Sequence, residues 1–389
     1  MKQQQKPDAA PQKRNMLLRL LAFLLTAAMV LGALALVVFR DELNLDSIRR
    51  WFAYRSLQTG QTDQTEPFAH GGGERLDIAR LEDGYLFAST AGAQYYSFGG
   101  KELSSHVTRM EKPVLSTSDS YGVVYDAGGD SLYLFGQSHE PYVYTSENGG
   151  ILSARVNNAG WLTVTALHEH YRGGVTVLDS RHTPVITLNY SSAFVTDAIL
   201  SPDGDTVVVV TISQTDGTFH STLHFYYTYG TEAFHTVTLD GFTVLDMDFD
   251  SEGLWLLGES SLVTLSAKGE ELGRYTFDPA YLKGYALEGD GFAALLLGRY
   301  RAGSASDLVT VGRDGQLMAQ QELTAQILSL SACGRYLSIL SGQQLEIFTR
   351  DLTPYALLDD TRHARHVTLC SDASALLADS QDAWLYIPS

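Results

Sequence analysis

Cysteine is almost absent from this chain of 389 residues, which contains only Cys333 and Cys370. Two thiols cannot build the disulfide framework of a small secreted domain or the four-cysteine cage of a structural zinc site. The two residues occupy matching places in consecutive repeats, and the sequence leaves open whether they pair. Because 44% of the residues are apolar, we expect a packed apolar core to stabilise the fold.

Basic residues are scarce beyond position 55. Of the 27 Lys and Arg residues, nine lie within the first 55 positions, which hold only four of the 45 Asp and Glu residues. The rest of the chain therefore carries a net charge of about −23. A field of this sign repels the phosphate groups of nucleic acids. We therefore expect no nucleic-acid partner.

Signatures of common catalytic sites are also missing. No GxSxG stretch occurs, which argues against a serine hydrolase of that type. The glycine run at 71–73 precedes no helical pattern, which argues against a phosphate-binding loop. The sequence therefore identifies no catalytic residue.

One long apolar run stands near the N-terminus. Residues 20–39 read LLAFLLTAAMVLGALALVVF without a charge, a length that matches the ~30 Å of hydrocarbon crossed by a transmembrane helix. The preceding segment, 1–19, carries five basic residues and one acidic residue, so the positive-inside rule predicts a cytoplasmic tail. We predict a single-pass signal anchor in the cell membrane, with the C-terminal domain extracellular.

A cleaved signal peptide is the alternative interpretation of this run, because Ala33-Leu34-Ala35 offers a small-x-small cleavage site. The apolar core of a signal peptide usually spans about 7–15 residues. Here the apolar run continues through Phe39, which favours the anchor.

Residues 40–65 are predicted to form a juxtamembrane amphipathic helix and a linker. An apolar helical face that includes Trp51 and Phe52 is typical of a helix at a membrane surface. In this hypothesis the rings of Trp51, Phe52 and Tyr54 lie at the depth of the lipid headgroups. Packing of the helix on the following domain is the alternative. The polar residues 58–65 complete the linker.

One unit recurs throughout the last segment, 66–389. Each copy has an alternating strand, a turn, an apolar strand, a second turn and a third strand, usually followed by a more polar fourth. No sustained 3.6-residue apolar period occurs there, which excludes helical repeats. The first turns recur every 38 to 49 residues or so and hold Gly84, Gly122, Gly160, Gly204, Gly253, Gly291 and Gly334, with Ala373 in the eighth place.

Strands that are apolar on both faces, such as DTVVVVT at 205–211, must be covered on both sides. A chain without helices achieves this by packing sheet on sheet, and a closed ring leaves no uncovered end face. We therefore predict an all-β fold, a β-propeller of eight four-stranded blades, or of seven if the long copy 194–240 is irregular. Because the last copy ends after its third strand, we expect residues 66–69 to supply the fourth.

Two stretches carry a resemblance to known proteins. The SPDG turn at 201–204, followed by an apolar strand, resembles the repeats of bacterial WD40-like and quinoprotein-like propellers. The order of basic tail, anchor, DSIRRWFAYRS at 46–56 and repeats with DGYLFAST at 83–90 resembles a family of uncharacterised membrane-anchored propeller proteins of Gram-positive bacteria. This resemblance implies the fold and the anchor, and it implies no chemistry.

Three carboxylates alternate with apolar residues in the stretch VLDMDFD. In a strand, Asp246, Asp248 and Asp250 share one face, where their oxygens can bind Ca²⁺. A hand-type calcium loop is excluded, because Ser251 and Leu257 occupy the places of its Gly and Glu. A calcium site is one hypothesis for these residues, and acids that face a channel or a turn without a metal are the other.

Aromatic residues cluster at Phe225, Tyr226, Tyr227 and Tyr229. They can form a stacking platform for sugars or peptides, or they can pack between blades. Because neighbouring side chains alternate in a strand, we expect one set to face each adjacent blade.

These features favour a membrane-anchored extracytoplasmic binding or scaffolding module. We expect the lipid bilayer and a protein or cell-envelope component as its partners, and no cofactor apart from the hypothetical Ca²⁺. The alternative is a propeller enzyme, such as a quinone-dependent dehydrogenase or a glycan-active hydrolase, whose acids converge in the central channel.

Overall fold

The computed structural model describes residues 19–27, 29–30, 45–60, 62–136, 140–147 and 149–388. The chain divides into two compact units, Met1–Ala53 and Tyr54–Ser389. Residues 19–27 and 29–30 are helical, and helix α2 spans Leu45–Tyr54, where the sequence predicts a helix. No helix in these described stretches is long and apolar enough to cross a membrane. Part of the predicted anchor, 31–39, and the tail before Arg19 lie outside the described residues.

The second unit consists of eight four-stranded antiparallel sheets. The first four contain β2 (Asp77–Leu81), β3 (Gly84–Ser89), β4 (Gly92–Ser97) and β5 (Glu102–Val107); β6 (Pro113–Thr117), β7 (Gly122–Asp126), β8 (Ser131–Phe135) and β9 (Tyr142–Thr145); β10 (Ile151–Val156), β11 (Leu162–His168), β12 (Tyr171–Leu178) and β13 (Pro184–Asn189); and β14 (Phe194–Leu200), β15 (Thr206–Thr215), β16 (Thr218–Tyr227) and β17 (His235–Asp240). The others contain β18 (Asp246–Asp250), β19 (Gly253–Leu257), β20 (Ser261–Ser266) and β21 (Glu271–Thr276); β22 (Tyr281–Gly289), β23 (Phe292–Gly298), β24 (Ser306–Gly312) and β25 (Leu317–Leu323); β26 (Ile327–Cys333), β27 (Tyr336–Ser341), β28 (Leu345–Thr349) and β29 (Pro354–Leu358); and β30 (His366–Leu369), β31 (Ala375–Ala378), β32 (Asp382–Tyr386) and β1 (Phe68–Ala69). We call these sheets blades 1 to 8, in this order.

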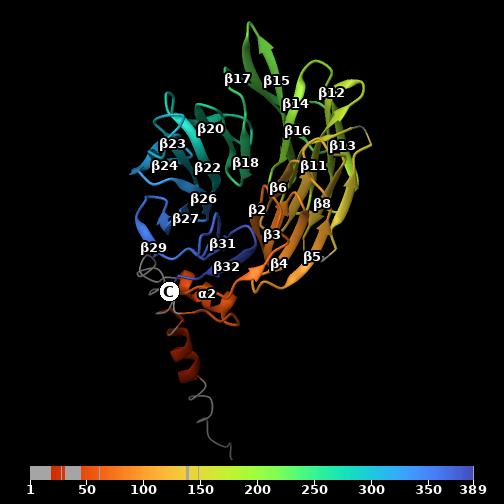
Figure 1. The fold of residues 1–389 in the computed structure, drawn as a ribbon. Helices are drawn as coiled ribbons and strands as arrows, with labels where there is room; N and C mark the ends of the chain where they lie inside the picture. The colour runs from red at the N-terminus through yellow and green to blue at the C-terminus, as the bar shows by residue number, and fades with distance from the viewer. Residues whose placement is uncertain are drawn as a thin grey trace, which may run out of the picture. The chain divides into compact units, whose positions relative to one another are not determined.

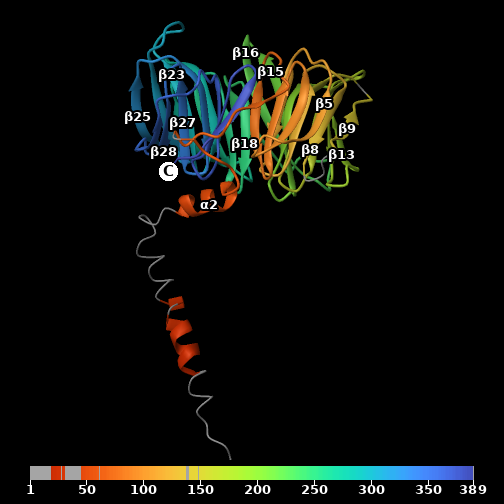
Figure 2. The ribbon, with the colours of Figure 1, turned by 60° about the horizontal axis from the view of Figure 1, so that its bottom comes forward.

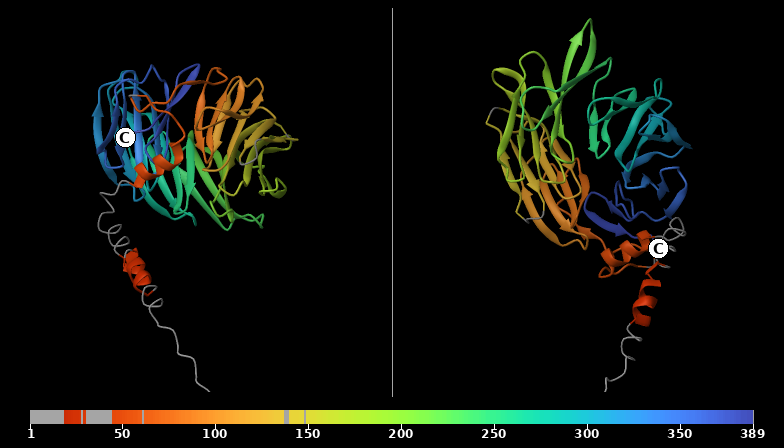
Figure 3. Two further views of the ribbon diagram at one scale, coloured as in Figure 1. Left: turned by 90° about the horizontal axis from the view of Figure 1, so that it is seen from below. Right: turned by 180° about the vertical axis from the view of Figure 1, so that it is seen from behind.

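The blades form a closed ring, in which the last blade lies beside the first (Figures 1 and 3). The strands of each blade run side by side in the view of Figure 2. Eight apolar clusters of described residues each join two successive blades, and one of them closes the ring between blades 8 and 1. Middle strands such as β3 are buried at every position because both of their faces are covered. The prediction of an eight-bladed propeller is confirmed.

The last blade is completed by the strand that the sequence predicts. Phe68 pairs with Ala383 and Ala69 with Asp382, so β1 is the outer strand of blade 8. The N-terminal end of the propeller therefore holds its C-terminal end in the ring.

In six of the eight repeats the residue in the first turn has a positive φ, a backbone conformation that favours glycine. Gly253 has a φ of 144°, and a Cβ at this position would lie 2.1 Å from the carbonyl oxygen of Leu265. Ala373 keeps a left-handed φ of 67° in the eighth repeat, at a cost of about 1 kcal/mol. The degenerate eighth turn therefore keeps the left-handed geometry without the glycine.

Blade 4 accommodates its greater length in one hairpin. β15 and β16 have 10 residues each, and their pairing runs from Thr206↔Tyr227 to Thr215↔Thr218. Asp216 and Gly217 both have positive φ, as a two-residue type I′ turn requires. The hairpin projects beyond the neighbouring sheets (Figure 1), so the long repeat is a complete blade with an extension.

Candidate functional site

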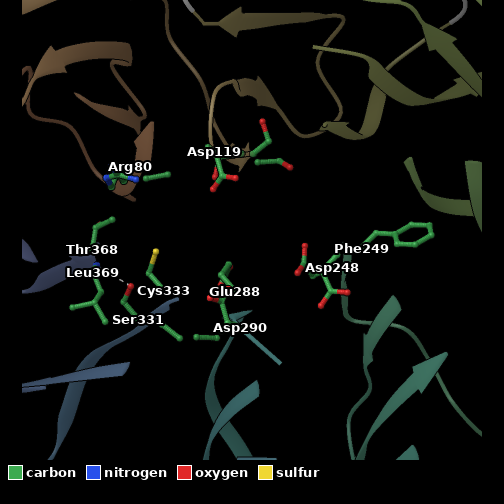
Figure 4. A pocket seen from close by; sticks show the side chains of 18 of the residues that line it. Arg80, Asp119, Asp248, Phe249, Glu288, Asp290, Ser331, Cys333, Thr368 and Leu369 are labelled. Carbon is green, nitrogen blue, oxygen red and sulfur yellow. Dashed lines mark hydrogen bonds between the residues drawn. The ribbon is translucent and has the colours of Figure 1, made fainter. Parts of the chain in front are cut away.

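A cavity of about 960 Å³ lies at the centre of the ring, lined by residues from all eight blades. Its walls are the ends of the inner strands and the turns that follow them. Figure 4 shows carboxylates, a guanidinium, a thiol and hydroxyls among the side chains that line it. Because the chain crosses this region eight times, residues far apart in sequence meet here.

The three predicted aspartates share one face of β18, because Met247 and Phe249 between them are buried on the other. Asp246 accepts a hydrogen bond of 2.7 Å from Nη2 of Arg155. Asp250 accepts one of 3.0 Å from Nε1 of Trp255 and pairs with Arg313. Among the described residues no group of three or more His, Cys, Asp or Glu is arranged to hold a metal ion. The calcium site therefore stays a prediction without structural support.

Arg155 links three blades. Its Nε and Nη2 donate to Oδ2 of Asp197 at 2.9 and 2.7 Å, and its Nη1 donates to the carbonyl oxygen of Met247 at 2.7 Å. Asp197 lies in blade 4, whereas Met247 and Asp246 lie in blade 5. The two carboxylates raise the pKa of Arg155 against the effect of its burial. This network is structural, and the sequence alone could not reveal it, since 91 positions separate Arg155 from Asp246.

Asp248 and Glu288 line the same side of the cavity, from blades 5 and 6 (Figure 4). Enclosure in the ring, together with the negative charge of Asp250, raises the pKa of Asp248 to about 6. Enclosure and the charge of Asp248 raise the pKa of Glu288 to about 7, although its side chain is in contact with the water of the cavity. Neither carboxylate has a cation within ion-pair distance among the described residues.

Arg80 lines the cavity from blade 1. Its Nε is buried and has no hydrogen-bond partner among the described residues. Its guanidinium lies 5.6 Å from the ring centre of Phe98, and the nearby ionisable groups are thiols and phenols, including Cys370 and Tyr85. No sequence motif marks Arg80, because it stands in an ordinary alternating strand.

The two cysteines are free thiols at the ends of the inner strands of blades 7 and 8. Cys370 is buried, and its Sγ lies 3.4 Å from the hydroxyl of Tyr85. Cys333 lines the cavity, and burial raises the pKa of its thiol to about 12. In this structure the two cysteines do not form a disulfide.

The aromatic cluster divides into two parts. Phe225 packs in the interface with blade 5 and Tyr226 in that with blade 3, as the alternation predicts. Tyr227 stacks on Tyr229 and on Phe234, with ring centres 5.2 and 4.3 Å apart. Tyr229 is 81% exposed, so the stack offers an aromatic surface at the rim of blade 4.

The three predicted membrane-interface residues differ in their exposure. Trp51 and Phe52 are each 61% exposed. Tyr54 is only 5% exposed and packs in the cluster between blades 8 and 1. Tyr54 therefore belongs to the protein interior and cannot contact headgroups, whereas the roles of Trp51 and Phe52 stay predictions.

The fold is shared with proteins of very different sequence. The chain resembles BamB from Moraxella catarrhalis, with 13% identity and a TM-score of 0.53 over 83% of this chain and 99% of that one. It also resembles the C-terminal WD40 domain of Sif2, with 10% identity and a TM-score of 0.57 over 82% of this chain and 100% of that one. At such identities the likeness shows the fold alone.

The sequence matches none of the curated proteins. It does match, over residues 54–352, the model of a family of unknown function, DUF5711. Because this match covers more than half of the chain, the protein belongs to the DUF5711 family.

Proposed function

We propose that this protein is a membrane-anchored scaffold whose propeller binds a protein partner on the outer side of the membrane. The partner adds an extended strand to the free edge of the hairpin β15–β16. The fold shared with BamB and the WD40 domain of Sif2 agrees with a role in protein interaction, but this is an analogy. The observation that carries the proposal is the unpaired edge at residues 213–215.

Three residues at the end of β15 have a neighbouring strand on one side only. The pairing of β14 with β15 ends at Phe194↔Ile212. Beyond it, Ser213, Gln214 and Thr215 pair with β16 alone and are exposed. Backbone direction alternates along a strand, so of these three residues Gln214 directs its N–H and C=O outward, where they are free to pair with another strand.

The direction of these groups follows from the opposite edge of the hairpin. The N–H of Ser221 donates to the carbonyl oxygen of Phe242, away from β15. Backbone direction repeats every second residue, so Phe219 points its N–H the same way. Its cross-strand partner Gln214 then points its own N–H away from β16, towards solvent.

Nothing in the sequence of this edge protects it from pairing. Exposed edges are usually shielded by Lys, Pro or a bulge. Residues 212–219 read ISQTDGTF, and their register is regular. Phe194 and Phe219 beside the edge are 54% and 51% exposed, which adds apolar surface for the side chains of a partner.

The proposed membrane anchor is supported by the sequence and by the exposure of its apolar side chains. Residues 20–39 carry no charge and follow a basic tail. The large apolar side chains of the helical residues 20–27 and 29–30 are between 54% and 71% exposed. Ile48, Trp51 and Phe52 of α2 are also more than half exposed, which suits a helix at the membrane surface.

Photo-crosslinking in intact cells tests the scaffold. A photoreactive residue at Thr215 should capture one discrete protein, whereas the same residue at Glu259, an exposed position between β19 and β20, should not. Gln214→Pro removes the outward N–H without removing a hairpin hydrogen bond and should abolish capture, while Gln214→Ala should preserve it. Equal capture at both positions, or capture that survives Gln214→Pro, would contradict the proposal.

The anchor needs a separate test. Protease added to intact cells should digest a C-terminal epitope tag and leave an N-terminal tag protected. Digestion of the N-terminal tag alone would reverse the orientation. Release of the protein from membranes by high salt would show that no segment spans the bilayer.

A further inference from the structure

The central cavity holds charges of both signs that have no ion-pair partner among the described residues. Arg155, which also lines the cavity, and Arg313 each pair with carboxylates. Within the described part of the chain, Arg80 has no carboxylate within ion-pair distance, and Asp248 and Glu288 have no cation. Glu288 contacts the water of the cavity, whereas Arg80 and Asp248 are half-buried. A half-buried charge without a partner is costly, so charges left unpaired in one cavity indicate a ligand that completes them.

Arg80 is the positive charge that can bind an anion. Its Nε is buried in the protein, so the two terminal Nη groups are the donors that can form two parallel hydrogen bonds with a carboxylate. Hydroxyl groups from blade 7 also line the cavity. Oγ of Ser331 accepts a hydrogen bond from the N–H of Leu369 (Figure 4), and Oγ of Ser329 accepts one from the N–H of Val367. Both bonds use only an oxygen lone pair, so each hydroxyl keeps its proton to donate to a ligand.

Asp248 and Glu288 are the counterpart for a cation. They come from neighbouring blades, and the negative charge of Asp248 helps to raise the pKa of Glu288. A metal ion needs more ligands than these two carboxylates, and no larger group is arranged for one among the described residues. An ammonium group needs only one or two carboxylates as acceptors.

The overall charge restricts the anionic end of the ligand. The propeller carries about −23, and Asp77, Asp119 and Asp290 also line the cavity. Such a field repels phosphates and other multiply charged anions. A single carboxylate, offset by an ammonium on the same molecule, enters without net charge.

From these observations we propose that the cavity binds a small zwitterion, with its carboxylate on Arg80 and its ammonium between Asp248 and Glu288. Arg80 lies in blade 1, whereas Asp248 and Glu288 lie in blades 5 and 6. The two charged ends of the ligand are therefore separated by a chain that spans the cavity. The volume of about 960 Å³ suits a small organic molecule. This site is independent of the hairpin edge in blade 4.

Calorimetric titration of the full-length protein in detergent micelles tests the site. The probes are 6-aminohexanoate, with both charges, hexylammonium, with the cation only, and hexanoate, with the anion only. We expect 6-aminohexanoate to bind at least about tenfold more tightly than either single-charge probe. Equal affinities for all three would show two unrelated ion sites and overturn the proposal, as would the absence of binding by any of them.

Substitutions test which residues bind the two charged ends of the ligand. Arg80→Gln should weaken 6-aminohexanoate about tenfold and leave hexylammonium unchanged, whereas Glu288→Gln should weaken both. Arg350→Gln is the matched control, because Arg350 also lines the cavity but is exposed; it should change neither affinity more than about twofold. Thermal unfolding of each variant checks that it folds. If Arg80→Gln and Arg350→Gln weaken 6-aminohexanoate equally, the assignment of Arg80 is wrong.

Discussion

The hydroxyl groups of Tyr54 and Ser374 lie 2.9 Å apart, although 320 positions separate the two residues. Ser374 donates its own proton to Asp372 at 2.6 Å, so Tyr54 is the donor to Ser374. The bond is buried between the start of the propeller and its last blade. It holds together the place where the ring closes.

Substitution of Tyr54 should therefore weaken the closure. Tyr54→Phe removes one buried hydrogen bond and should lower the free energy of unfolding by about 1 kcal/mol. Tyr54→Ala also removes the packing of the aromatic side chain between blades 8 and 1, and it should lower the free energy of unfolding by about 3–5 kcal/mol. Urea unfolding of the two variants measures both values. A cost below about 1 kcal/mol for Tyr54→Ala would mean that this residue does not pack in the core.

The short strand β1 should hold blade 8 in place. The ring of Phe68 lies 5.3 Å from that of Tyr96, and its backbone pairs with β32. We expect Phe68→Ala to lower the free energy of unfolding by about 2 kcal/mol. It should also speed amide hydrogen exchange in β32 more than in β20, which lies on the far side of the propeller. Val143→Ala, at a half-exposed position of β9, is the control and should cost less than about 0.5 kcal/mol. Uniform acceleration of exchange across the ring would contradict a local closing role.

The sequence predicts the blades because each repeat carries its own signals. The turn at Gly253 and the apolar strands on either side of it are local features; such strands return in all eight repeats, and a positive φ at the turn residue returns in six. The alternation of Asp246, Asp248 and Asp250 likewise predicts a shared face correctly. The burial of Tyr54 was not predictable, because its partner Ser374 belongs to the other end of the chain.

The contents of the cavity could not be read from the sequence for a related reason. A repeat pattern places strands in a ring but does not say which side chains meet across it. Arg155 takes Asp246 as a partner, and Arg313 takes Asp250, so the predicted acidic face is largely neutralised by residues from other blades. In the part of the chain that the structure describes, Arg80 has no such partner, and no local pattern distinguishes it from the paired arginines.

The third prediction concerns the ion pairs of Arg155. Arg155→Met keeps most of the side-chain volume but leaves Asp197 and Asp246 without their cation, and it should cost about 3–5 kcal/mol. Adding Asp197→Asn and Asp246→Asn removes the unpaired charges and should restore about half of the loss. Chemical unfolding of the single and triple variants measures both effects. A triple variant less stable than Arg155→Met would show that the carboxylates stabilise the ring by other contacts.

The last prediction concerns Glu288, whose pKa rises from 4.5 to about 7 in the folded protein because of enclosure in the ring and of the charges of Asp248 and Asp246. A carboxyl with a raised pKa binds its proton more tightly in the folded than in the unfolded chain. Its contribution to stability is therefore complete below pH 4.5 and is lost as the pH rises through about 7.

Glu288→Gln should consequently stabilise the protein at pH 8 and leave it unchanged at pH 4. The expected gain is about 1 kcal/mol, a value reduced because the side chain contacts the water of the cavity. Urea unfolding at the two pH values measures it, with Glu259→Gln, in an exposed turn, as the control that should show no pH-dependent gain. An equal gain at both pH values would mean that the substitution acts through packing, and that the charge of Glu288 does not destabilise the folded ring.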